Sequence, residues 1–144
     1  VKWFDYKINN KSYGELGQQA IAFGLSDIPL AMVSGDSAAC DEAKTLVPNI
    51  KTACVKTAKG RNKAECINPK EAYDAIFDAA KNAVLDIKTF KPYKIKFPVN
   101  LELTLSRSDY CDEIAENSPH LKRCGRTIYK QLDKITNYHD LVAF

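Results

Sequence analysis

A short continuous apolar run, Ile28–Val33, is followed directly by the turn residues Ser34–Ser37 and then by a helical pattern that ends near Leu46. An apolar run bounded by turn residues is typical of a buried strand in a parallel sheet. Asp36 or Ser37 can cap the following helix through a side-chain oxygen. A strand, a short turn and a capped helix form the unit of an α/β sheet, so this stretch predicts an α/β fold.

The pattern of the first half extends this alternation. Residues 2–8 and 50–56 are strand-like, residues 15–25 are helical, and residues 57–68 are predicted to be a polar loop. The clearest helix begins at Asn68-Pro69, where Asn can cap and Pro suits the first helical position.

The last third is richer in strand patterns. Apolar and polar residues alternate from Tyr93 to Ser106, which is typical of a strand with one exposed face, and residues 121–129 are strand-like around Gly125. Over 144 residues this order predicts a single α/β domain, 1–144, with a mostly parallel sheet and a strand-rich carboxyl-terminal part.

Composition excludes several classes of function. The chain is 45% hydrophobic and 27% charged with a net charge of +3, as in an ordinary soluble globular protein, and its lysines are scattered. Nucleic-acid binding needs a concentrated basic face, and a membrane span needs about 20 apolar residues, so we expect neither partner. The five cysteines include no Cys-x-x-Cys pair, which predicts reduced thiols in a cytoplasmic protein; one or two disulfides are the alternative.

One carboxylate is distinguished by its neighbours. Gly14 and Gly17 flank Glu15, and glycines leave room for an ion or a close backbone approach. The spacing Ser12-x-x-Glu15 also matches a helix capping box, and the residues alone favour that structural role. Elsewhere the chain has no phosphate-binding loop, dinucleotide fingerprint or nucleophile elbow.

Two further sets of residues have ordinary interpretations. His120 and His139 lie in polar segments, which favours surface positions over catalysis. Four basic residues of one segment could meet an anion, although a solvated loop is the favoured interpretation; they are Lys56, Lys59, Arg61 and Lys63.

Three stretches together are similar to the carboxyl-terminal part of the zinc-dependent D-aminopeptidases, self-compartmentalising metallopeptidases that cleave short D-amino-acid peptides. They are Ile8-Asn9-Asn10 with Tyr13-Gly14-Glu15-Leu16-Gly17; Ile28-Pro29-Leu30-Ala31-Met32-Val33-Ser34-Gly35-Asp36; and Val55-Lys56 with Arg61, Pro69 and Glu71-Ala72. Their order and spacing are more specific than any one of them. The resemblance covers essentially the whole chain and weakens after Pro98.

The resemblance implies a function and a set of site residues. Glu15 matches a glutamate that binds the family's two-zinc centre, where a zinc-activated water attacks the peptide carbonyl. It implies an enzyme, a zinc-dependent aminopeptidase, that forms a homo-oligomer. Three further residues, Ser34, Gly35 and Asp36, together with Gly14 and Gly17, are expected to shape the site.

The chain also departs from the family pattern. The Asp-x-Glu motif, the ligand histidines and the catalytic histidine of the family lie upstream of the matching region, and none is found here. One carboxylate cannot bind two zinc ions, so we expect no catalytic residue in this chain and no activity from it alone. It is then a fragment, one chain of a split enzyme, or a domain whose amino-terminal half is absent. The alternative is a non-catalytic α/β module for ligand binding or subunit interaction.

Overall fold

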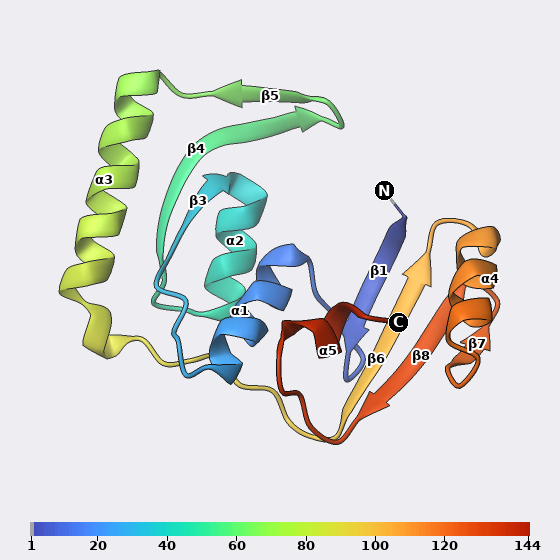
Figure 1. The fold of residues 1–144 in the computed structure, drawn as a ribbon. Helices are drawn as coiled ribbons and strands as arrows, with labels where there is room; N and C mark the ends of the chain where they lie inside the picture. The colour runs from blue at the N-terminus through green and yellow to red at the C-terminus, as the bar shows by residue number, and fades with distance from the viewer. Residues whose placement is uncertain (1) are drawn as a thin grey trace. The chain divides into compact units, whose positions relative to one another are not determined.

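The computed structural model describes residues 2–144; Val1, at which the predicted domain begins, lies outside the described residues. The chain forms two compact units (Figure 1). The first comprises the described residues up to Gln18 together with Lys94–Phe144, and the second comprises Gln19–Tyr93. The prediction of a single domain is not tested by this division and stays a prediction.

The first unit is built on a five-stranded antiparallel sheet in the order β2-β1-β6-β8-β7. The strands are β1 (Trp3–Ile8), β2 (Lys11–Ser12), β6 (Val99–Leu105), β7 (Lys122–Cys124) and β8 (Thr127–Leu132). Asn9 and Asn10 connect β1 to β2 with φ values of 50° and 66°. Positive φ at both turn positions is the geometry of a two-residue hairpin, and Asn tolerates it.

The core of the first unit follows from the alternation in β6. The side chains at every second position of this strand are buried, as is Ile128 opposite Leu103 on β8. These buried β6 residues are Val99, Leu101, Leu103 and Leu105. The short helix α5 (Tyr138–Val142) is fastened by Lys130, whose Nζ donates to the carbonyls of Asp140 and Ala143 at 3.1 and 2.6 Å. A cation at the carbonyl end of a helix is favourable.

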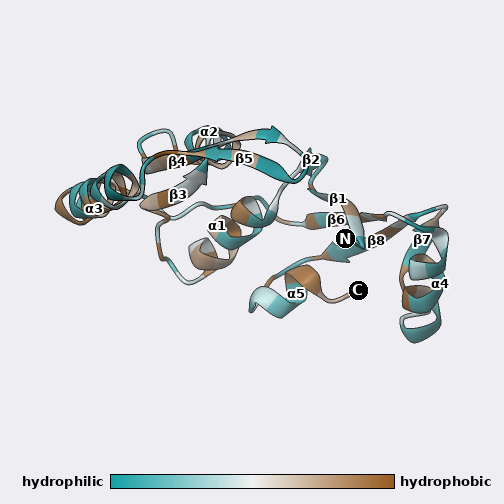
Figure 2. Cartoon of the chain, turned by 90° about the horizontal axis from the view of Figure 1, so that it is seen from above, coloured by the Kyte–Doolittle hydropathy of each residue, from teal (hydrophilic) through white to brown (hydrophobic). Residues whose placement is uncertain are grey.

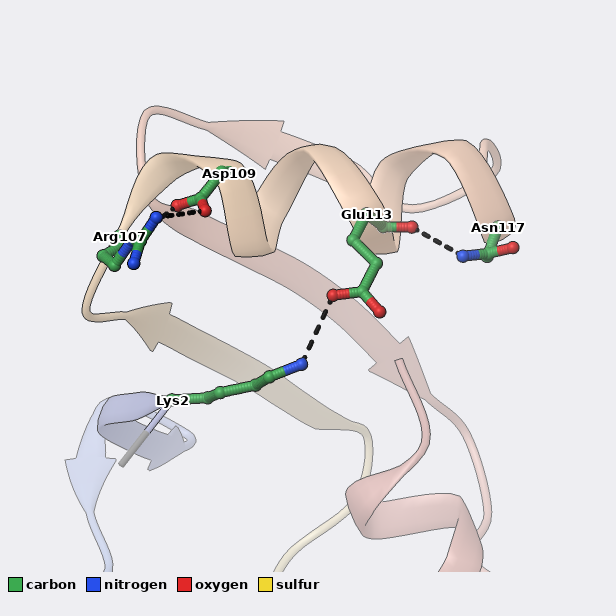
Figure 3. Close-up of polar contacts among 5 residues, drawn as sticks. All are labelled: Lys2, Arg107, Asp109, Glu113 and Asn117. Carbon is green, nitrogen blue, oxygen red and sulfur yellow. Dashed lines mark hydrogen bonds and ion pairs between the residues drawn. The ribbon is translucent and has the colours of Figure 1, made fainter.

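Helix α4 (Ser108–Asn117) carries a group of exposed polar contacts (Figure 3). Lys2 Nζ lies 3.3 Å from Glu113 Oε2, and Arg107 forms an ion pair of 2.6 Å with Asp109. The ring of Tyr110 lies close to both cations, about equally far from Lys2 Nζ and Arg107 Cζ, at 5.0 and 5.2 Å. Exposed ion pairs contribute about 0–1 kcal/mol, so these contacts orient α4 more than they stabilise it.

The second unit contains a three-stranded sheet in the order β3-β4-β5. The strands are β3 (Met32–Asp36), β4 (Lys51–Gly60) and β5 (Lys63–Cys66). Helices α2 (Ser37–Leu46) and α3 (Pro69–Leu85) both pack against β4, and the 3₁₀ turn η1 (Ile87–Thr89) follows α3. Helix α1 (Glu15–Leu25) begins in the first unit and ends in the second. No helix in the described part of the chain is long and apolar enough to cross a membrane.

The α/β class is confirmed, but the prediction of a mostly parallel sheet is wrong. Among the described strands, β3 and β4 form the single parallel pair, and every other pair is antiparallel. The strand–helix–strand unit predicted around residues 28–56 exists, with its first strand displaced to Met32–Asp36. The predicted polar loop at 57–68 is instead a hairpin of β4 and β5, since backbone pairing in an exposed hairpin requires no apolar side chains.

Candidate functional site

Glu15 is the first residue of α1, and its side chain is exposed. Backbone hydrogen bonds fix the segment on both sides of it: Tyr13 N donates to Tyr6 O at 2.8 Å, and Gln18 N donates to Gly14 O at 3.1 Å. A carboxylate in the first turn is stabilised by the helix dipole. The chain therefore presents this carboxylate to solvent from a firmly positioned helix start.

The glycines beside Glu15 differ in their structural roles. A Cβ at Gly17 would lie 2.5 Å from Cδ1 of Tyr13, so the ring of Tyr13 can lie against the first turn of α1 because Gly17 has no side chain. Gly14 precedes the helix and supplies its first carbonyl acceptor. Gly17 thus fixes the backbone on which Glu15 stands.

The capping-box interpretation of Ser12 and Glu15 is wrong. Ser12 belongs to strand β2, and Glu15 occupies the first position of α1 rather than the third, which the capping box requires. The carboxylate of Glu15 is consequently not used for that cap.

Ser34, Gly35 and Asp36 form the last part of β3, in the second unit, whereas Gly14, Glu15 and Gly17 belong to the first unit. Asp36 Oδ1 accepts a hydrogen bond of 2.8 Å from Ala39 N, so Asp36, one of the two caps that the sequence allowed, caps α2. A cap of this kind contributes about 1 kcal/mol.

The remaining two residues of this group have simpler surroundings. A Cβ at Gly35 would lie 3.2 Å from Cβ of Ala39, which makes Gly35 the point of close approach between β3 and α2. Ser34 is exposed.

The described residues do not fit a zinc ion by themselves. Residues 2–144 contain no group of three or more His, Cys, Asp or Glu side chains that could bind a metal. Zinc in proteins has about four ligands, three of them from the protein in catalytic sites, and Glu15 offers one carboxylate. His120 and His139 are exposed and join no such group.

The structure also contains a pocket to which the sequence analysis assigned no role. Its volume is about 790 Å³, and residues of β6, β7, β8 and the β1–β2 turn line it. The alternation of residues 93–106 places Asn100 and Glu102 on the polar face of a strand, and this is the only sign of the pocket in the sequence pattern. Their partners on β8 depend on long-range pairing, which a local pattern does not show.

Comparisons with known proteins agree on one family. The family model described as D-aminopeptidase matches residues 2–143. A curated D-aminopeptidase of Bacillus subtilis (strain 168) is 36% identical over 87 residues, which cover 60% of this chain and 32% of that protein. The solved structure of the "Zn-dependent D-aminopeptidase DppA from Bacillus subtilis, a self-compartmentalizing protease" superposes with a TM-score of 0.88 at 25% identity. That match covers 98% of this chain and 52% of the solved one, so the chain spans about half the length of that structure.

Proposed function

The chain belongs to the D-aminopeptidase family, and from this premise we propose that it is the carboxyl-terminal part of a peptidase that hydrolyses short peptides of D-amino acids. The observation that carries the proposal is the family match over residues 2–143. The solved Zn-dependent relative, which has the same fold over 98% of this chain, supports it.

Glu15 is the residue that we propose as a zinc ligand. Its carboxylate is exposed, stands on a backbone fixed by hydrogen bonds, and is not used in the capping box expected from its spacing. The remaining donors, for two zinc ions in the complete protein, would come from an amino-terminal half or a second chain, because residues 2–144 supply no donor cluster.

We propose that the other predicted site residues position the backbone. Gly14 and Gly17 fix the start of α1, and Gly35 and Asp36 connect β3 to α2, with Ser34 exposed beside them. We assign none of them a catalytic role.

The test is Glu15→Gln in this chain combined with the amino-terminal half or second chain that would supply the remaining donors. Glutamine preserves size but removes the anionic charge that a zinc ligand supplies. We expect zinc content and hydrolysis of D-alanyl-D-alanine to fall by about two orders of magnitude or more, while the melting temperature of the metal-free protein changes little.

Glu71→Gln is the matched control. Glu71 is also an exposed glutamate in the first turn of a helix, α3, and has no proposed ligand role. Its substitution should leave zinc content and hydrolysis unchanged. Full zinc occupancy and full activity in Glu15→Gln would remove Glu15 from the site.

A second candidate function, subunit interaction, is favoured by the outer face of α3. Tyr73, Phe77, Ala80 and Val84 are exposed at 4-3-4 spacing along this helix, and Val84 is 71% exposed. Hydrophobic and hydrophilic stretches alternate along α3 in Figure 2. Spacing of this kind forms an apolar seam for a facing helix.

We propose a second copy of the chain as the occupant of this seam. The solved relative is described as self-compartmentalizing, which implies association of several copies. We also propose a cytoplasmic location, which the five free cysteines support.

A further inference from the structure

Three residues of the 790 Å³ pocket lie in one row across the antiparallel sheet. Glu102 on β6 pairs with Tyr129 on β8, and Tyr129 pairs with Lys122 on β7. Directly paired residues project to the same face of a sheet. Adjacent strands are about 4.8 Å apart, so the backbone positions of Glu102 and Lys122 are separated by roughly 10 Å across Tyr129.

The charged side chains of this row have no partner in the part of the chain that the structure describes. The side chains of Glu102, Lys122 and the nearby His120 form no hydrogen bond or ion pair within residues 2–144. Lys7, the β1 residue paired with Glu102, lies 3.6 Å from Asp5 and forms its ion pair there. Glu102 is half-buried, and a charge-assisted hydrogen bond to a cationic partner would be favourable for its carboxylate.

The rest of the lining is suited to peptide groups. Asn100 and Gln131, paired one step further along the same strands, and Asn10 of the β1–β2 turn supply side-chain amides that can both donate and accept. Leu121, just before β7, and Tyr129 supply apolar surface. A few convergent polar groups on an apolar wall are the usual composition of a ligand site.

The separation and sign of the charges select the ligand class. A carboxylate and an ammonium at opposite ends of the row oppose a purely anionic ligand such as a nucleotide and fit a zwitterion. Two extended residues span about 7 Å, which is shorter than the separation of roughly 10 Å between Glu102 and Lys122. The side chains of Glu102 and Lys122 can therefore each reach one end of a dipeptide.

We propose that this pocket binds a zwitterionic dipeptide, with the ligand ammonium at Glu102, its carboxylate at Lys122 and its body over Tyr129. The choice of a peptide among zwitterions rests on the proposed function. The pocket lies wholly within the first unit and shares no residue with the proposed metal site at Glu15.

The test measures binding of D-alanyl-D-alanine to the 144-residue chain by isothermal titration calorimetry near neutral pH. Its N-acetylated form lacks the ammonium, and its carboxamide form lacks the carboxylate. Each modified peptide should bind about tenfold or more weakly, since one charge-assisted hydrogen bond is lost.

Two variants assign each loss to a residue. Glu102→Gln should bind the free and N-acetylated peptides equally but still bind the carboxamide more weakly. Lys122→Met should bind the free peptide and the carboxamide equally but still bind the N-acetylated peptide more weakly. Glu116→Gln and Lys134→Met, exposed outside the pocket, should behave as the unaltered chain.

Three results would overturn the proposal. The first is that the free dipeptide does not bind at about 10 mM. The second is that the unaltered chain binds all three peptides equally. The third is that the loss of affinity from a variant and the loss from the matching peptide modification are additive. The comparison of the three peptides uses the unaltered chain, so it tests the proposal even if a variant does not fold. Zinc content and hydrolysis in Glu15→Gln are measured separately, on this chain combined with the half or second chain that supplies the remaining donors, so either proposal can fail while the other stands.

Discussion

The hydroxyl of Tyr6 donates a hydrogen bond of 2.8 Å to the carbonyl of Leu141, across 135 residues of sequence. Tyr6 is buried on β1, and Leu141 is fully buried in α5. Burial raises the pKa of Tyr6, so the hydroxyl keeps its proton and remains a donor well above neutral pH. This bond fastens the last helix of the chain to its first strand.

Tyr6→Phe should therefore destabilise the chain by about 1 kcal/mol, because the Leu141 carbonyl loses a buried donor. Urea unfolding followed by circular dichroism measures the change. Tyr73→Phe, which removes the hydroxyl of a tyrosine that is 68% exposed, is the control and should be neutral. Equal stability of Tyr6→Phe and the unaltered chain would show that the bond makes no net contribution.

Acid stability should depend on Asp140. Its carboxylate accepts hydrogen bonds from the backbone N and hydroxyl of Thr136, both at 2.7 Å, and these bonds lower the pKa of Asp140. Because the folded pKa lies below the unfolded one, the stabilisation is present above the unfolded pKa, near 4, and is lost as pH falls through the folded pKa. Asp140→Asn should flatten this part of the curve of melting temperature against pH, measured from about pH 2 to pH 6. Parallel curves would contradict the assignment.

The cysteines should titrate in two groups. Cys54, Cys66 and Cys124 are exposed, whereas Cys40 and Cys111 are buried, and burial raises the pKa of both buried thiols. A thiol reagent without reductant should modify the three exposed cysteines quickly in the folded chain and all five after denaturation. Recovery of only one or three thiols after denaturation would reveal disulfides.

The isolated 144-residue chain should bind zinc weakly and hydrolyse no D-alanyl peptide. A single carboxylate provides too few donors, and residues 2–144 contain no metal-binding group of three side chains. Elemental analysis after dialysis against zinc, with a peptidase assay in parallel, measures both. A tightly bound pair of zinc ions would show that donors converge in a way absent from the described structure.

Self-association should depend on the α3 seam. Phe77→Lys places a charge in the seam and should weaken association about tenfold or more in sedimentation equilibrium. Asn82→Lys adds the same charge to an exposed polar position of the same helix and should not. Equal association of both variants would place the subunit contact elsewhere.

Local patterns predicted the elements well where one residue type forces a local geometry. Asp36 was one of two predicted caps and does cap α2, and Asn68-Pro69 correctly marked the start of α3. Each depends on contacts within a few residues, which single-sequence reasoning can follow.

The failures involve contacts between distant segments. The strand predicted from Tyr93 begins only at Val99, and a Cβ at Gly24 would lie 1.9 Å from the carbonyl oxygen of Tyr93, so this segment passes closely over α1 instead. The helix predicted to begin at Asn68-Pro69 is present, yet its apolar residue Val84 is exposed, because a helical pattern does not show what covers the helix. The candidate site at Glu15 came from the family resemblance, while the pocket at Glu102 required the pairing of β6 with β8.

The hairpin of β4 and β5 has a practical consequence. Every residue from Lys56 to Lys70 is exposed, and the turn lies far from the buried side chains of β4 such as Ala53. Trypsin has accessible cleavage positions there, at Lys59, Arg61 and Lys63, and exposed tips of this kind tolerate inserted sequence. The tip is therefore the place to attach a fluorophore or an affinity tag, because none of the residues from Lys56 to Lys70 contributes a buried side chain to the second unit.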